Sequence, residues 1–194
     1  MTTLEAREFV HFSPGDNHWH VGLGAFAVGT AFERDRHFVS TALPSLRRLR
    51  DVTKGREICR SVARVGGRVP ITTSGMGKAI LSSYSLAEIS DVLRRRGLRR
   101  LTPNTLATRE ALVQNLIQIE SVGYSVDDQE NSPDVRCIAA PVYDGRSEIL
   151  CAISVSGVPS RITPDCVPVI GRTVARIAGE LSDLMRGQGA PLQL

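Results

Sequence analysis

The apolar positions near the C-terminal end of the chain repeat with a helical period. Spacings of three and four residues put such side chains on one face of a helix, and Thr163 with Pro164 marks its start. With fewer than four heptads, the stripe favours packing on the chain's own sheet, with a coiled-coil seam as the alternative. The stripe consists of Val167, Ile170, Val174, Ile177, Leu181 and Leu184.

Capping signals predict two helices in the middle of the chain. Ser85 and Glu88 form a capping box for a helix that stops near Gly97. A second helix follows Thr108 and ends at Gly123. The face that this second helix buries is predicted to consist of Leu112, Leu116 and Ile119.

The N-terminal part predicts smaller elements. Residues 1–21 indicate a short helix and a small hairpin, and residues 22–53 indicate two helices. The second of these should present Leu43, Leu46 and Leu49 on one face. Residues 54–71, which are basic and glycine-rich, predict one strand.

Residues 136–157 alternate between apolar and small polar side chains, which predicts two strands joined by a turn at Asp144–Ser147. Because strand side chains alternate between faces, Cys137, Ser154 and Ser156 are expected on the face opposite to the aliphatic set. That aliphatic set consists of Ile138, Ala140, Val142, Ile149, Ile153 and Val155.

The register of this hairpin follows from the same pattern. Both aliphatic sets share a face only if paired residue numbers sum to an odd value, for example Tyr143 opposite Glu148. A short strand at residues 124–128 precedes the hairpin. Helices and an antiparallel sheet in separate runs predict an α+β fold, with a central antiparallel sheet flanked by helices.

The turn at residues 74–79, "SGMGKA", opens a helix with unpaired backbone N–H groups, which favour anions. If it lies over the small-residue face of the hairpin, a carboxylate could bind these N–H groups. Hydroxyl or keto oxygens could then bind Cys137, Ser154, Ser156 and a carboxyl group such as that of Asp127. Such recognition suits a small oxo- or hydroxy-acid.

Composition narrows the class of protein. The 194 residues are 42% apolar, with a formal charge of +4. No apolar run is long enough for a membrane span, so a soluble, cytoplasmic chain is predicted. Its four scattered cysteines suit reduced thiols better than disulfides or zinc. The basic cluster at residues 93–100, "LRRRGLRR", is expected to be an exposed helix end, with contact to nucleic acid or a partner as the alternative.

Several stretches resemble the IclR family of bacterial transcription regulators, in which a winged helix-turn-helix is joined by a linker helix to a GAF/profilin-like effector-binding domain. They include "GRVPITTSGMGKAIL", "LTPNTLATREALVQNLIQIESVGYSVDDQE", "RCIAAPVYD", "AISVSGVPSRIT" and "VIGRTVARIAGELSDLMRG". The resemblance implies a domain at 1–21 that is the end of the winged helix-turn-helix, a linker helix at 22–36 and an effector-binding domain at 37–190.

The resemblance also implies site residues and partners. The effector carboxylate would bind the backbone of Gly75 and Met76, and the pocket residues would be Asp127, Cys137, Ser154 and Ser156. Implied partners are a small carboxylic acid, operator DNA through the winged helix-turn-helix of the intact protein, and further copies of the chain in a homodimer or homotetramer. Compared with family members, this chain is shorter near residues 54–61, and Asp134 replaces a frequent glycine.

Alternatives accompany these predictions. Cys137 could be a buried hydrophobe, and Asp127 could cap a turn while Asp128 serves the ligand. His11, His18 and His20 could bind a metal, but the sequence offers no further ligand near them.

An enzyme is disfavoured because every histidine precedes the predicted domain and "SGMGKA" departs from a nucleotide loop, so no cofactor is expected. An oligomerisation module without a ligand is the remaining alternative.

Overall fold

The computed structural model describes residues 3–53 and 70–188. The chain divides into two compact units, between Pro44 and Ser45. The strand predicted within residues 54–71, and the short stretch near 54–61, fall almost entirely outside the described residues.

The first unit begins with a short helix and a hairpin, as the sequence predicted. Helix α1 spans Thr3–Ala6, and strands β1 (Val10–Ser13) and β2 (His18–Val21) pair antiparallel with His11 opposite His20. Strand β2 is exposed along its whole length. This hairpin presents its side chains to solvent within its own unit, because it is too small to enclose a core.

Helix α2 is one continuous helix, Leu23–Thr53, where the sequence analysis predicted two. It continues through Pro44. Of the three leucines predicted on one face, Leu49 is buried, whereas Leu43 is 42% and Leu46 is 40% exposed. Steps of three residues fall short of the 3.6-residue turn, so a row of such steps rotates around the helix. The buried positions after Pro44 are instead four residues apart: Ser45, Leu49 and Thr53.

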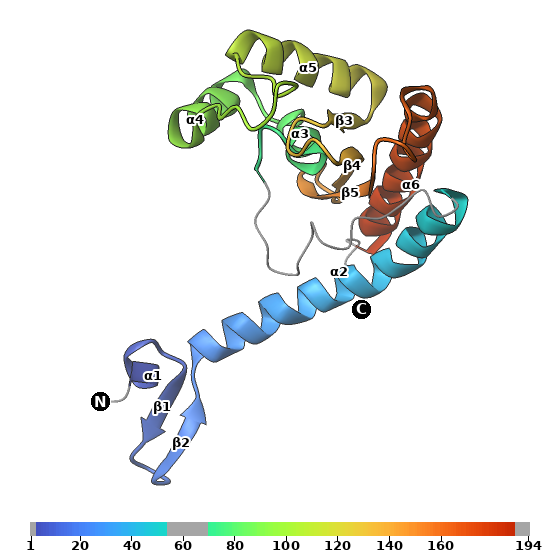
Figure 1. The fold of residues 1–194 in the computed structure, drawn as a ribbon. Coiled ribbons are helices and arrows are strands. Elements are labelled where there is room, and N and C mark those ends of the chain that lie inside the picture. Colours follow the sequence, from blue (N-terminus) through green and yellow to red (C-terminus); the bar gives the residue numbers. More distant parts are fainter. Residues whose placement is uncertain (1–2, 54–69, 189–194) are drawn as a thin grey trace. The chain divides into compact units, whose positions relative to one another are not determined.

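The second unit is built on a three-stranded antiparallel sheet in the order β3-β4-β5 (Figure 1). Strand β3 spans Ser125–Asp128, β4 Arg136–Tyr143 and β5 Ile149–Gly157. The predicted odd-sum register is confirmed from Arg136 to Val142, where for example Ile138 lies opposite Val155. The aliphatic side chains of β4 and β5 therefore share one buried face.

A bulge changes this register at the end of the hairpin. Tyr143 pairs with Ile149, so the predicted Tyr143–Glu148 pair is wrong. The turn explains the shift: the Asp144 carboxylate accepts hydrogen bonds from the N–H groups of Arg146 (2.8 Å) and Glu148 (2.9 Å). The Asp144 N–H also donates to the Glu148 carbonyl. Glu148 therefore belongs to the turn.

The C-terminal helix packs on this sheet, which agrees with the first interpretation of its apolar stripe. Its first turn is a 3-10 helix, Pro164–Cys166, and helix α6 follows at Val167–Gln188. Leu184 of the predicted stripe is 50% exposed. Val167 is half-buried, and the remaining members are buried: Ile170, Val174, Ile177 and Leu181.

The aromatic ring of Tyr124, the residue just before β3, packs closely against Gly171 of α6. A Cβ placed on Gly171 would lie 2.4 Å from the ring of Tyr124, far inside van der Waals contact. Tyr124 therefore occupies the space that a side chain at position 171 would need. This contact fixes α6 against the residue next to β3.

Helices α3, α4 and α5 complete the second unit (Figure 1). Helix α3 spans Gly75–Leu81, α4 Leu86–Arg96 and α5 Arg109–Val122. The predicted capping box, the Thr108 N-cap and the left-handed Gly123 C-cap are all present. A core cluster joins these helices and contains Leu81, Ile89, Leu112, Leu116 and Ile119. The unit is an α+β fold, as predicted.

Candidate functional site

A row of polar side chains crosses the sheet on one face. Asp127 of β3 lies opposite Cys137 of β4, and Cys137 lies opposite Ser156 of β5. One step along the strands, Ala139 lies between Ser125 and Ser154. Because side chains alternate along a strand, all these residues face the same side of the sheet.

Helix α3 begins over this polar face. The Ser125 hydroxyl donates a hydrogen bond to the Gly75 carbonyl at 2.6 Å. A Cβ on Gly75 would lie 3.0 Å from the Cys137 Sγ and 3.2 Å from its carbonyl oxygen. Residue 75 must therefore be small for α3 to sit this close. Met76 follows in the same turn and is half-buried.

The turn before α3 is held by its own cap. The Ser74 hydroxyl accepts a hydrogen bond from the Gly77 N–H at 3.0 Å and donates to the Pro70 carbonyl at 2.6 Å. Together with the hydrogen bond from the Ser74 N–H to the Pro70 carbonyl, these bonds hold residues 70–74 against the first turn of the helix. The cap thus fixes the direction from which Gly75 approaches the sheet.

Cys137 lies at the centre of the predicted site residues. Burial raises the pKa of its thiol, and the nearby Asp127 carboxyl group raises it further. Hydrogen bonds from the Ser156 and Ser154 hydroxyls and from the Gly75 backbone oppose this rise without cancelling it. The group is therefore a neutral thiol surrounded by two hydroxyls and a backbone amide, with none of the thiolate character that a nucleophile needs.

The two adjacent aspartates play different structural parts. Asp127 is buried, and its Oδ1 accepts hydrogen bonds from the N–H groups of Glu130 (2.8 Å) and Asn131 (3.2 Å). Asp128 is exposed, and its carboxylate accepts a hydrogen bond from the buried Arg136 at 2.8 Å. Only Asp127 therefore belongs to the polar row with Cys137.

A pH-dependent effect is expected at Asp127. Burial raises the pKa of this carboxyl above its ordinary value, although its backbone hydrogen bonds and Lys78 lower it. A raised pKa in the folded state favours folding at low pH, and this contribution is lost as pH rises through the folded-state pKa. Asp127→Asn retains the accepting oxygen but does not titrate.

The stability of the wild type relative to Asp127→Asn should therefore fall as the pH rises from about 4 toward neutral values. Urea unfolding of both chains across that range measures the difference. Asp134→Asn, a change at an exposed position, is the control and should follow the wild type. A constant difference between the wild type and Asp127→Asn would contradict the expectation.

A buried ion pair beneath α3 escaped the sequence analysis. Lys78 is fully buried, its Nζ pairs with the Glu130 carboxylate, and it donates to the Val126 carbonyl at 2.7 Å. Within the described residues, the second Glu130 oxygen, Oε2, has no hydrogen-bond partner. The only signal in the sequence was a lysine inside a small apolar helix, because its partner is 52 residues away.

The other candidate groups lie elsewhere. His20 pairs with Asp16 at 2.7 Å, and in the described part of the chain no three metal-ligating side chains converge. Among the described cysteines, Cys137, Cys151 and Cys166 form no disulfide. None of the described helices has the length and apolarity to cross a membrane.

Comparison with known proteins identifies the family. A model described as "Bacterial transcriptional regulator IclR C-terminal" matches residues 51–183. The chain belongs to the IclR family. The HTH-type transcriptional repressor AllR of Klebsiella pneumoniae is 35% identical to this IclR-family chain, over 94% of the chain and 74% of AllR. AllR of Escherichia coli K12 is 33% identical over the same shares.

Solved structures of IclR-type regulators share the fold. The Thermotoga maritima IclR matches with a TM-score of 0.73 at 23% identity, over 94% of this chain and 82% of that one. The Agobacterium tumefaciens repressor BlcR matches with a TM-score of 0.69 at 22% identity, over 94% and 80%. These likenesses confirm the predicted α+β fold.

Membership of the family settles the class of function. The chain is the effector-binding part of a transcriptional regulator, and its relatives are repressors. Regulators of the IclR type bind DNA and small-molecule effectors and are not enzymes. The prediction that this chain is not an enzyme is therefore confirmed.

Proposed function

We propose that this IclR-family chain binds a small carboxylic acid, an oxo- or hydroxy-acid, on the polar face beneath α3. The backbone of Gly75 and Met76 would bind the carboxylate. The effector's other oxygens would bind Asp127, Cys137, Ser154 and Ser156. Binding would control how the intact regulator occupies its operator.

The proposal rests chiefly on the surroundings of the Cys137 thiol. Two hydroxyls from β5 and a backbone group from α3 converge on the buried, neutral sulfur of β4. A hairpin packed only for stability has no need of this set, because buried polar groups cost free energy unless they are paired. Such a set suits the oxygens of a small acid.

The chemistry of the site favours an acid with a second oxygen function. Ser154 and Ser156 are half-buried, and their hydroxyls can donate to a carbonyl or accept from a hydroxyl. A carboxyl oxygen of Asp127 can accept a hydrogen bond from a hydroxyl group of the effector. The solved inducer-binding domain of a PobR double mutant, 23% identical with a TM-score of 0.59, holds 3-hydroxybenzoic acid, so an aromatic acid belongs among the candidates.

Thermal unfolding against a panel of acids tests the proposal. The panel contains glyoxylate, pyruvate, other oxo-acids, sugar acids and 3-hydroxybenzoate. An effector at about 100 times its dissociation constant stabilises the folded chain by about 2.7 kcal/mol. For a chain of this size the midpoint should rise by roughly 5–10 °C.

The double variant Ser154→Ala/Ser156→Ala should bind the same acid about 10- to 100-fold more weakly, because two hydrogen bonds are lost. The control, Ser121→Ala/Ser160→Ala, removes two exposed hydroxyls and should bind as the wild type does. Equal binding by both double variants would show that Ser154 and Ser156 do not bind the effector. A panel without any stabilising acid, together with a chain that still oligomerises, would favour the alternative of an oligomerisation module.

We also propose a role for each part of the chain in the intact regulator. Residues 1–21 would be the end of the winged helix-turn-helix, 22–36 the linker and 37–190 the effector-binding domain. The intact protein would bind operator DNA as a homodimer or homotetramer. An effector can shift that assembly only by binding one arrangement more tightly than another.

A further inference from the structure

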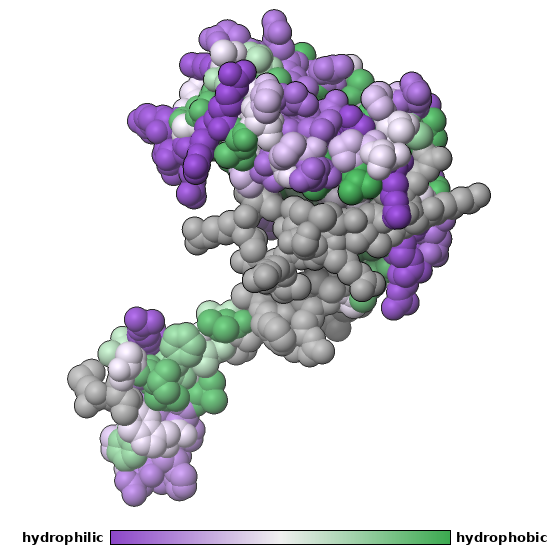
Figure 2. Space-filling view, in the orientation of Figure 1, coloured by the Kyte–Doolittle hydropathy of each residue, from purple (hydrophilic) through white to green (hydrophobic). Residues whose placement is uncertain are grey.

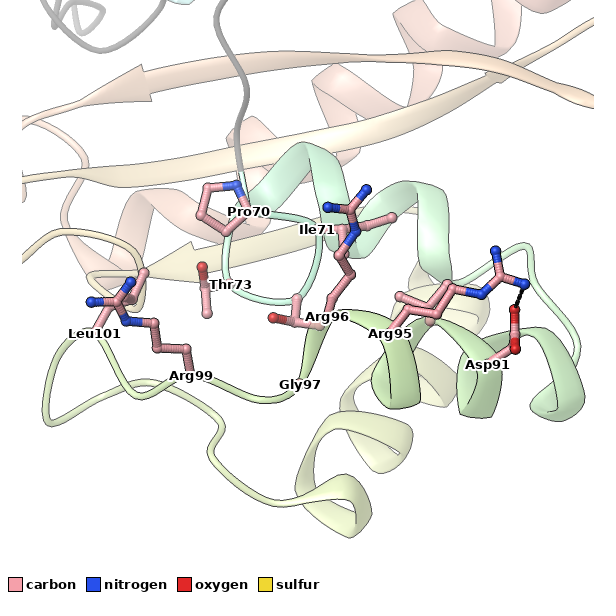
Figure 3. A pocket seen from close by; sticks show the side chains of 11 residues that line it. Pro70, Ile71, Thr73, Asp91, Arg95, Arg96, Gly97, Arg99 and Leu101 are labelled. Atoms are coloured by element: carbon pink, nitrogen blue, oxygen red, sulfur yellow. Dashed lines mark ion pairs between the residues drawn. The ribbon is translucent and has the colours of Figure 1, made fainter.

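A groove lies beside the loop that leads into α3, away from the polar row. Its volume is about 700 Å³. Residues 70–73 line one side, and the last turns of α4 with the loop to Leu101 line the other (Figure 3). Volumes of this size are typical of sites for small molecules.

The groove carries positive charge that the described residues do not neutralise. Arg95 turns toward Asp91 and forms an ion pair with it, whereas Arg96 and Arg99 extend away from that pair (Figure 3). Within the described residues, neither Arg96 nor Arg99 has an ion-pair partner. Strongly hydrophilic side chains gather over α4 (Figure 2). An arginine fork binds carboxylate or phosphate oxygens in pairs.

The groove also has an apolar lining. Ile71 and Val92 are half-buried, and Leu101 is 38% exposed. Thr72 and Thr73 add hydroxyl groups to the same lining. A hydrated inorganic anion gains nothing from contact with these aliphatic side chains, whereas the apolar body of an organic anion can pack against them.

We propose that this groove is a second ligand site, for an organic anion that joins a carboxylate or phosphate group to an apolar body. Arg96 and Arg99 bind the anionic group, and Ile71, Val92 and Leu101 contact the body. A nucleic acid backbone fits less well, because it needs a row of cations along an open surface. Here the two cations border a hollow that also contains the Asp91 carboxylate.

The second site adjoins the first through the cap of α3. Thr72 and Thr73 directly precede the N-cap Ser74. Thr73 is also linked to the first site, because its hydroxyl donates to the Asn131 side chain at 3.4 Å and Asp127 accepts from the Asn131 N–H. A ligand that orders this loop therefore acts on the turn that places Gly75. Any resulting coupling between the two ligands must be reciprocal.

Calorimetric titration of the full chain with phenyl phosphate tests this proposal. Phenyl phosphate should bind saturably, and at least 10-fold more tightly than inorganic phosphate, which lacks the apolar body. Arg96→Gln/Arg99→Gln should weaken it at least 10-fold. The control, Arg100→Gln/Arg172→Gln, removes the same charge from exposed arginines outside the groove and should change the affinity less than 2-fold.

Several results would overturn the proposal. Equal weakening by both double variants would show general charge attraction only. Equal affinity for inorganic phosphate would show that the apolar lining does not contribute to binding. Displacement of phenyl phosphate by a short DNA duplex would indicate a nucleic acid surface instead. Ser154→Ala/Ser156→Ala should retain phenyl phosphate binding, so the second site can stand even if the first proposal fails.

Discussion

Replacing Lys78 by methionine is expected to lower the free energy of unfolding by about 3–5 kcal/mol. The change leaves the Glu130 carboxylate buried without its cation, and it removes the donor to the Val126 carbonyl. Glu130 already has one oxygen without a described partner. An uncompensated buried charge is among the costliest single defects a core can contain.

The pH dependence of this variant provides a second measurement. Burial raises the pKa of Glu130, and Lys78 contributes most to lowering it, so the pKa should rise further in Lys78→Met. A raised folded-state pKa gives stability at low pH that is lost as pH rises through it. The defect should therefore shrink as the pH is lowered toward the ordinary glutamate range, about pH 4, and urea unfolding measures this change.

A double variant separates charge from packing. Lys78→Met/Glu130→Leu replaces the pair by apolar side chains and should recover most of the lost stability, because buried pairs gain little over well-packed apolar groups. A loss below about 1 kcal/mol for Lys78→Met alone would mean that water reaches Glu130 in the folded chain.

Gly77→Ala is expected to cost about 3 kcal/mol of stability, at the upper end of overpacking effects. A Cβ at this position would lie 2.4 Å from the Ile71 carbonyl oxygen and 2.6 Å from the Ile71 Cα. These are backbone atoms in the loop closed by Ser74, so no side-chain rotation relieves the clash. The loop must move, and acid binding at Gly75 should weaken with it.

Gly179→Ala is the matched control for this prediction. Gly179 is exposed within α6, and a Cβ there meets no atom within 4 Å. Alanine should raise stability by about 0.5–1 kcal/mol through helix propensity. Denaturant unfolding of both variants measures the contrast, and a similar effect of the two changes would contradict the close approach at Ile71.

The hairpin shows what the sequence could predict. The alternation of aliphatic and small polar residues was enough to place Cys137, Ser154 and Ser156 on one face, because a register slip would expose the whole aliphatic set. The bulge at Tyr143 depended on hydrogen bonds inside the turn. A period of two carries no information about such local bonds.

Contacts between distant segments were harder to predict. The Lys78–Glu130 pair and the groove at Arg96 depend on which loops meet, and no local pattern encodes that. Helix α2 was predicted as two helices, yet the backbone remains helical through Pro44. A helix tolerates a proline where the lost hydrogen bond is outweighed by the rest of the helix.

The ring of Tyr124 against Gly171 limits how the C-terminal helix can move. Sliding α6 along its axis by one turn, about 5.4 Å, would bring Val167 or Ala175 to the ring, and either side chain would collide with it. Translation of α6 is therefore blocked unless Tyr124 moves as well. Because Tyr124 is bonded in the chain to Ser125, which holds the Gly75 carbonyl, α6 and the start of α3 must shift together or remain still.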